Sequence, residues 1–224
     1  MYCTRYLCLH GAGTNAQILR AQMGAVLREV SKEGKTEFVF LQGEIDSEPH
    51  PAIKDVYEGP FFNWFPWPPK LGQEHYARTL QDAYELIYEF VEDEGPFDGI
   101  IGFSQGATLA YMTLLDQQKL KPYDVPLFSR AIFICGMPPF RLTDNSQIVL
   151  EPDTQVLNIP AIHVMGEQDE VLDLSMALAK LTNPNLSLSI VHAKGHDIPK
   201  SKDFALQMFK GMEQLDRVAN AFGI

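Results

Sequence analysis

The chain has few cysteines, no long apolar run and fewer basic than acidic residues. Its 224 residues include three cysteines, too few to predict a disulfide framework or a cysteine-rich metal site. We expect Cys8 and Cys135, which stand in apolar segments, to be small buried residues. No apolar stretch approaches the roughly 20 residues of a membrane-spanning helix, and the first residues lack a signal-peptide layout. These absences predict a cytoplasmic protein without a membrane span.

The charge balance argues against nucleic acid and anionic membranes as partners. Lys and Arg number 18 against 29 Asp and Glu, which gives a formal net charge of −11. Such a charge argues against binding nucleic acid or an anionic membrane through a wide electrostatic field. The hydrophobic fraction of 46% and charged fraction of 21% are those of an ordinary folded domain, without repeats or low-complexity tracts. We therefore predict one domain over residues 1–224 with a full core.

Apolar segments alternate with helical periodicity along the chain. This alternation is typical of an α/β fold, with about six mainly parallel strands and helices on both faces of the sheet. The predicted strands are Arg5–Leu9, Glu37–Leu41, Gly99–Phe103, Arg130–Cys135, Ala161–Met165 and Ser187–His192. The predicted helices are Asn15–Ser31, Gln73–Glu92, Gln105–Gln117, Asp173–Leu181 and Asp203–Ala221. Right-handed crossovers place the carboxyl ends of the strands on one edge, where α/β active sites form.

Two proline-containing segments interrupt this alternation. Residues 47–72 hold so many prolines that a regular helix or a central strand is excluded, and we predict a cap or lid-like insertion there. Residues 138–160 form a second long excursion. The first segment carries a cluster of aromatic residues: Phe61, Phe62, Trp64, Phe65 and Trp67. Their apolar surface exceeds what a solvated loop exposes, so they either pack on the sheet or line a substrate channel, and both alternatives stay open.

A glycine-flanked serine supplies the strongest chemical signal. Gly102-Phe103-Ser104-Gln105-Gly106 fits G-x-S-x-G, and the apolar pair Ile100-Ile101 before it reads as the end of a buried strand. An apolar helical pattern follows, so the motif stands at the strand-to-helix turn that presents a nucleophilic serine in α/β-hydrolases. A side chain at either glycine position would clash in so sharp a turn, and the serine backbone is strained. The pattern predicts Ser104 as the nucleophile.

An activated serine needs a general base and a group that holds the base in one tautomer. In α/β-hydrolases these follow the serine in the order Asp or Glu, then His. Asp169 and His196 each come just after a predicted strand, on the same sheet edge as Ser104. The other acidic candidates are Glu167, Glu170 and Asp173, and the other histidines are His50, His75, His163 and His192. The strand histidines are expected to be structural, and His50 and His75 to be exposed residues without metal-ligand spacing.

Negative charge on a substrate carbonyl oxygen requires preorganised N–H donors. We expect one from Gln105, at the start of the predicted helix, and the other from Ala12, in the glycine-rich loop after the first strand. The alternative for that loop is a simple helix N-cap through Thr14 or Asn15.

With these residues in place, the chain resembles the FSH1-type serine hydrolases of the α/β-hydrolase superfamily. The matching pieces are Leu9-His10-Gly11, Gly59–Phe65, Asp98–Ala107, Gly166–Asp169 and Gly195-His196. The resemblance implies an α/β-hydrolase fold beginning at the strand before the His-Gly loop, and a triad of Ser104, Asp169 and His196. Fungal members look like partners of polyketide synthases that cleave an acyl thioester from an acyl carrier protein.

The expected activity is therefore hydrolysis of an acyl thioester or ester through an acyl-serine, with no cofactor and no metal. A basic rim of Lys194, Lys200 and Lys202 is either a docking site for a carrier or a set of ordinary solvated lysines. The alternatives are a carboxylesterase for small esters, an acyltransferase or C–C bond-forming enzyme using the same acyl-serine, and a non-catalytic binding protein.

Overall fold

A six-stranded sheet forms the centre of the molecule. The computed structural model describes residues 3–67, 76–120, 126–142, 148–150 and 156–222. The strands of the sheet are β1 (Thr4–Leu9), β2 (Thr36–Leu41), β5 (Gly99–Phe103), β6 (Arg130–Ile134), β9 (Ala161–Gly166) and β10 (Ser187–His192). Their order is β10-β9-β6-β5-β1-β2, and every neighbouring pair is parallel. All six predicted strands are thus confirmed, with boundaries shifted by at most one residue.

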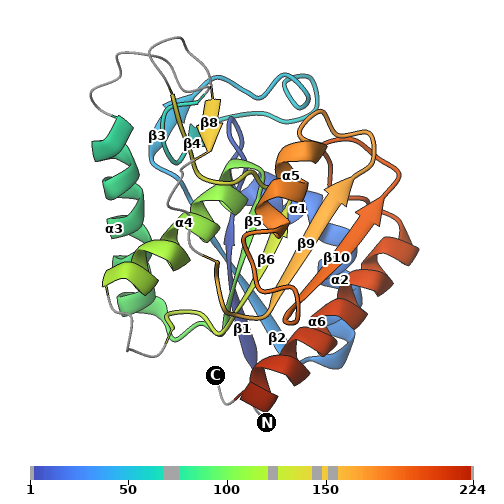
Figure 1. Ribbon diagram of the computed structural model, residues 1–224. Coiled ribbons are helices and arrows are strands. Elements are labelled where there is room, and N and C mark those ends of the chain that lie inside the picture. Colours follow the sequence, from blue (N-terminus) through green and yellow to red (C-terminus); the bar gives the residue numbers. More distant parts are fainter. Residues whose placement is uncertain (1–2, 68–75, 121–125, 143–147, 151–155, 223–224) are drawn as a thin grey trace.

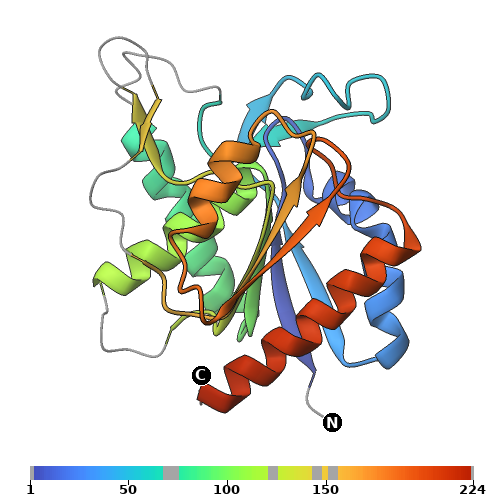
Figure 2. The same cartoon turned by 45° about the vertical axis from the view of Figure 1, so that its right-hand side comes forward.

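Both faces of the sheet are buried under helices (Figures 1 and 2). Along β1, Leu7 and Leu9 belong to one apolar cluster, whereas Tyr6 and Cys8 belong to another. This period of two sends successive side chains to opposite faces. Because both faces are covered, the strands read as nearly continuous apolar runs.

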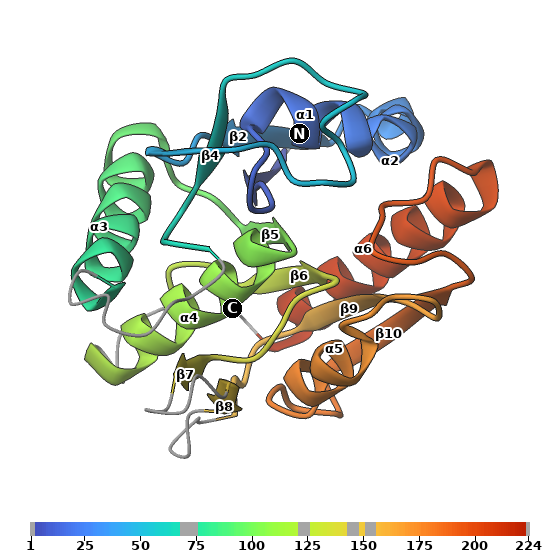
Figure 3. The same ribbon diagram turned by 90° about the horizontal axis from the view of Figure 1, so that it is seen from above.

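The helices divide between the two faces (Figure 3). Buried side chains of α1 (Ala16–Gln22), α2 (Gly24–Val30) and α6 (Lys202–Phe222) join the cluster of Tyr6 and Cys8. Those of α3 (Tyr76–Glu94), α4 (Gln105–Leu120) and α5 (Leu172–Ala179) join the cluster of Leu7 and Leu9. A single turn of 3-10 helix, Ser31–Glu33, follows α2. None of the helices in the described part of the chain has the length and apolar character to cross a membrane.

The prediction of one continuous helix over Asn15–Ser31 was wrong. The structure has two helices separated at Met23, whose ψ of −1° departs from regular helical geometry. Gly24 begins the second helix, and glycine is a weak helix former. The side chain of Asn15 caps the first helix by accepting a hydrogen bond from the N–H of Ile18 at 2.8 Å.

Two small sheets lie beyond the carboxyl edge of the large one (Figure 1). Strand β3 (Ile45–Ser47) pairs antiparallel with β4 (Phe61–Asn63), and β7 (Phe140–Leu142) pairs antiparallel with β8 (Ile148–Leu150). Sequence patterns did not reveal them, because each strand has three residues, and β4, β7 and β8 stand within the proline-interrupted segments. The exclusion of a central strand from residues 47–67 is confirmed, whereas residues 68–72 of the predicted cap lie outside the described residues.

Candidate active site

Ser104 stands at the turn between β5 and α4. Its φ of +53° falls in the left-handed region that a side-chain-bearing residue seldom adopts. A Cβ added at Gly102 would lie 2.3 Å from the carbonyl oxygen of Gly106, and one at Gly106 would lie 2.3 Å from that of Leu9. Gly102 is therefore required for the sharp turn from β5 into α4, and Gly106 for the approach of α4 to the end of β1, in agreement with the clashes predicted from the sequence.

A hydrogen-bonded chain links Ser104, His196 and Asp169. Nε2 of His196 lies 2.8 Å from Oγ of Ser104, and Nδ1 of His196 lies 2.8 Å from Oδ2 of Asp169. Asp169 follows β9 and His196 follows β10, so three parallel strands bring the groups together at one edge. The Asp169 side chain is 1% exposed and that of His196 is 24% exposed. The buried carboxylate can hold the proton on Nδ1, which leaves Nε2 to accept the serine proton.

The other histidines occupy different surroundings. His163 is buried within β9 against Phe133, and burial lowers its pKa to about 4. His192, at the end of β10, is also buried, and its Nδ1 accepts from the N–H of Lys194. His75 lies outside the described residues. These placements agree with structural roles for the two strand histidines.

His50 lies closer to the site than the sequence indicated. Its ring is half-buried and stacks on that of His196, with centroids 6.5 Å apart. Its pKa is lowered, chiefly by burial and then by His196. Its backbone N–H donates to the carbonyl of Gly13 at 3.0 Å, which fixes the loop beside the candidate oxyanion donors. The sequence offers no indication of this contact, because His50 and His196 are more than one hundred residues apart.

The candidate oxyanion donors belong to two segments next to Ser104, the start of α4 and the loop after β1. Gln105 is the first residue of α4, where backbone N–H groups have no partner within the helix. Ala12 is in the loop between β1 and α1, and within the described part of the chain its N–H donates to no protein acceptor. The loop also provides the Asn15 cap, so the two alternatives given for it are compatible.

The five aromatic residues do not share one environment. Trp64 and Phe65 are 2% and 0% exposed and belong to the core under α3 and α4. Phe61, Phe62 and Trp67 are only partly buried. The core packing suggested as one alternative thus describes Trp64 and Phe65, and the remaining three keep surface that a substrate can contact.

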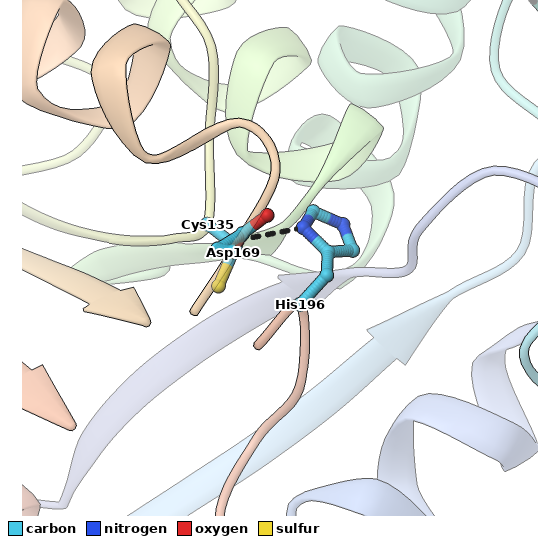
Figure 4. Close-up of side chains that lie close together, drawn as sticks. All are labelled: Cys135, Asp169 and His196. Carbon is cyan, nitrogen blue, oxygen red and sulfur yellow. Dashed lines mark hydrogen bonds and ion pairs between the residues drawn. The ribbon is translucent and has the colours of Figure 1, made fainter. Parts of the chain in front are cut away.

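Cys135 lies next to Asp169 and His196, although it was expected only to be a small buried residue. Its sulfur, a carboxylate oxygen of Asp169 and a ring nitrogen of His196 lie within 4.8 Å of one another (Figure 4). Cys135 is fully buried and has a φ of +49°. Burial and then the Asp169 carboxylate raise the pKa of its thiol, which keeps the sulfur protonated. Metal ligation needs a thiolate, and the raised pKa disfavours that form of Cys135.

The lysines proposed as a basic rim are mixed with acidic residues. Lys194 and Lys200 line a cavity of about 590 Å³ beside the His196 loop, and Asp197 and Asp203 line it as well. Lys202 is exposed at the start of α6. Positive and negative side chains are therefore balanced around this cavity. This arrangement favours ordinary solvated lysines over a cationic docking rim.

Comparison with known proteins gives matches along most of the chain. A family profile described as "Serine hydrolase (FSH1)" matches residues 1–208. "Hydrolase phiM" of Talaromyces stipitatus is 33% identical over 226 residues, covering 96% of this chain and 89% of that protein. "Esterase FPY3" of Fusarium mangiferae is 32% identical over 202 residues, covering 88% of each chain. The solved structure of esterase PE8 is similar in fold, with a TM-score of 0.63 at 20% identity, covering 96% of this chain and 93% of that one.

Proposed function

This chain belongs to the FSH1 family of serine hydrolases, and from that premise we propose Ser104 as its nucleophile, His196 as general base and Asp169 as the group that orients His196. Family membership makes the protein an enzyme of the hydrolase or esterase type. The observation that carries the assignment is the chain of two 2.8 Å contacts from Ser104 through His196 to Asp169.

The proposed reaction passes through an acyl-enzyme. Oγ of Ser104 attacks the acyl carbonyl while Nε2 of His196 takes its proton, and Asp169 stabilises the imidazolium. The N–H groups of Ala12 and Gln105 hold the oxyanion. The C–O or C–S bond then breaks as His196 returns the proton to the leaving group. Water, deprotonated by His196, attacks the acyl-serine. The bond between the acyl carbon and Oγ then breaks, His196 returns the proton to Oγ of Ser104, and the acid is released.

Within this chemistry we propose an acyl thioester as substrate, with the acyl chain delivered by an acyl carrier protein of a polyketide synthase. The resemblance to fungal hydrolases of that kind supports this choice. The partly exposed rings of Phe61, Phe62 and Trp67 supply apolar surface for the acyl chain. A carrier-bound thioester should react faster than a free thioester with the same acyl group.

Hydrolysis of small free esters is the second candidate. The relative FPY3 is named an esterase, and the proposed residues serve either substrate equally. The two candidates differ in the leaving group that the site prefers.

Intact-protein mass spectrometry tests the assignment. Native protein incubated with a long-chain acyl thioester should gain the acyl mass or release thiol, and Ser104→Ala should do neither. Reaction of simple esters alone would favour the small-ester candidate. Equal turnover by native protein and Ser104→Ala would refute the assignment of the nucleophile.

A further inference from the structure

Residues 60–65 run alongside the loop that carries the candidate oxyanion donor Ala12. The N–H of Phe62 donates to the carbonyl of Thr14 at 2.7 Å, and the N–H of Gly13 donates to Oδ1 of Asn63 at 2.8 Å. The side-chain amide of Asn15 donates to the carbonyl of Pro60 at 2.8 Å. We call residues 60–65 the splint, because these bonds fix it to the loop along its length.

Trp64, a residue of the splint, contacts both segments that carry the candidate oxyanion donors. Its indole N–H donates to the carbonyl of His10 at 2.7 Å, and its ring lies on the His10 ring with centroids 4.7 Å apart. The backbone N–H of Trp64 donates to Oε1 of Gln105 at 3.0 Å. The side-chain amide nitrogen of Gln105, Nε2, donates to the carbonyl of Phe65 at 2.9 Å. Trp64 therefore connects the loop after β1 with the residue after Ser104.

The His10 ring fixes the other end of this connection. The N–H of Gly43 donates to its Nε2 at 3.0 Å, so the proton of the neutral ring is on Nδ1, which donates to the carbonyl of Gly11 at 2.8 Å. Burial lowers the pKa of His10 to about 4, which keeps this arrangement neutral near pH 7. His10 and Gln105 are each 0% exposed, so water does not compete for their bonds.

We propose that Trp64 and the side chain of Gln105 are positioning residues that hold the backbone N–H groups of Ala12 and Gln105 at the separation an oxyanion requires. The inference rests on the proposed function, since it assumes a tetrahedral intermediate at Ser104. It assigns the splint a fixed role within the predicted cap: residues 60–65 support the catalytic loops and do not open over them. Preorganised donors need such support, because a displacement of about 1 Å costs up to a hundredfold in rate.

Two conservative variants test the proposal. Trp64→Phe removes the indole N–H and keeps a ring against His10, and Gln105→Met removes both side-chain bonds and keeps the backbone N–H. The loss of one net hydrogen bond corresponds to about a tenfold change in rate. We expect kcat for an ester substrate to fall by about tenfold in Trp64→Phe, which loses one bond, and by up to about a hundredfold in Gln105→Met, which loses two, with KM within about twofold of native in both. Affinity for an arylboronic acid, which mimics the tetrahedral intermediate, should fall by the same factor as kcat.

Tyr6→Phe is the matched control. It removes another buried polar contact of an aromatic ring, the 3.3 Å bond to Asp216, at the opposite end of β1 from the site. We expect its kcat and boronate affinity to equal those of the native protein, with all rates expressed per site titrated by a fluorophosphonate. A lower Tm in Trp64→Phe with native kcat per titrated site and native boronate affinity would overturn the proposal and leave only a structural role. Failure of the proposed function has a different signature, since Ser104→Ala would then retain activity.

Discussion

The folded protein should lose stability as the pH falls from 6.5 to about 4, because His10 and His163 are buried as neutral rings. They are 0% and 2% exposed, and burial lowers each pKa from 6.5 to about 4. The unfolded chain takes up a proton at each ring below pH 6.5, whereas the folded chain does so only below about 4. Unfolding is therefore increasingly favoured through this window, and no further loss from these rings occurs below it.

The magnitude follows from the size of the shift. One pKa unit corresponds to 1.36 kcal/mol, so a lowering of about 2.5 units costs about 3 kcal/mol for each histidine. The two together remove about 6 kcal/mol, which is comparable with the whole stability of many domains, about 5–15 kcal/mol.

Urea unfolding across this window measures the effect. Between pH values near 7.5 and 4, we expect these two histidines to lower the free energy of unfolding of the native protein by about 6 kcal/mol. Protonation of the carboxylates in the same range contributes a separate change. His163→Gln keeps a polar side chain beside Thr182, to which Nε2 of His163 bonds at 2.9 Å, but cannot take up a proton. Over the same pH range, the free energy of unfolding of His163→Gln should fall by about 3 kcal/mol less than that of the native protein. The same pH dependence in both proteins would refute the reasoning, whatever the stability of the variant near neutral pH.

Two further substitutions probe the site. Cys135→Ala removes a thiol that faces Asp169, and we expect a lower kcat because the carboxylate that orients His196 loses a neighbouring donor. Cys135→Ser, which keeps a donor, should restore kcat, and Cys8→Ala is the control at another fully buried cysteine. Gly106→Ala should lower the free energy of unfolding by about 3 kcal/mol or more in urea titration, since its Cβ would lie 2.3 Å from the Leu9 carbonyl oxygen. Gly24→Ala, whose Cβ meets only the end of the Arg28 side chain at 3.4 Å, should be neutral or stabilising, and an equal loss in both would contradict the steric argument.

The large sheet could be predicted from sequence because its signal is local. Each strand of a doubly covered parallel sheet is a short apolar run, and each run was recognisable by itself. The small strands β3 and β4 gave no such signal. They pair with each other through backbone bonds, and Phe61–Asn63 gains its conformation from contacts with residues 13–14 and 45–47, which are distant in sequence.

The same distinction applies to the site. Ser104, Asp169 and His196 could be proposed because each follows a strand that ends at the same edge, so topology alone brings them near one another. Cys135 also follows such a strand, β6, but a cysteine at a strand end has many structural roles and no motif separates them. His50 and Trp64 come from a segment without regular periodicity, so neither position could be derived before the fold was known.

Trp64 shows why composition alone could not assign the aromatic segment. Five aromatic residues in seven positions indicate a large apolar surface, but the backbone decides which rings face the core and which remain accessible. Trp64 is buried because its indole N–H and backbone N–H find acceptors on His10 and Gln105, and a buried indole requires such a partner. Gln105 also carries one of the candidate oxyanion donors, and His10 belongs to the loop that carries the other. Burial of this ring and the geometry of the site therefore depend on the same bonds, so a substitution that loosens one should loosen the other.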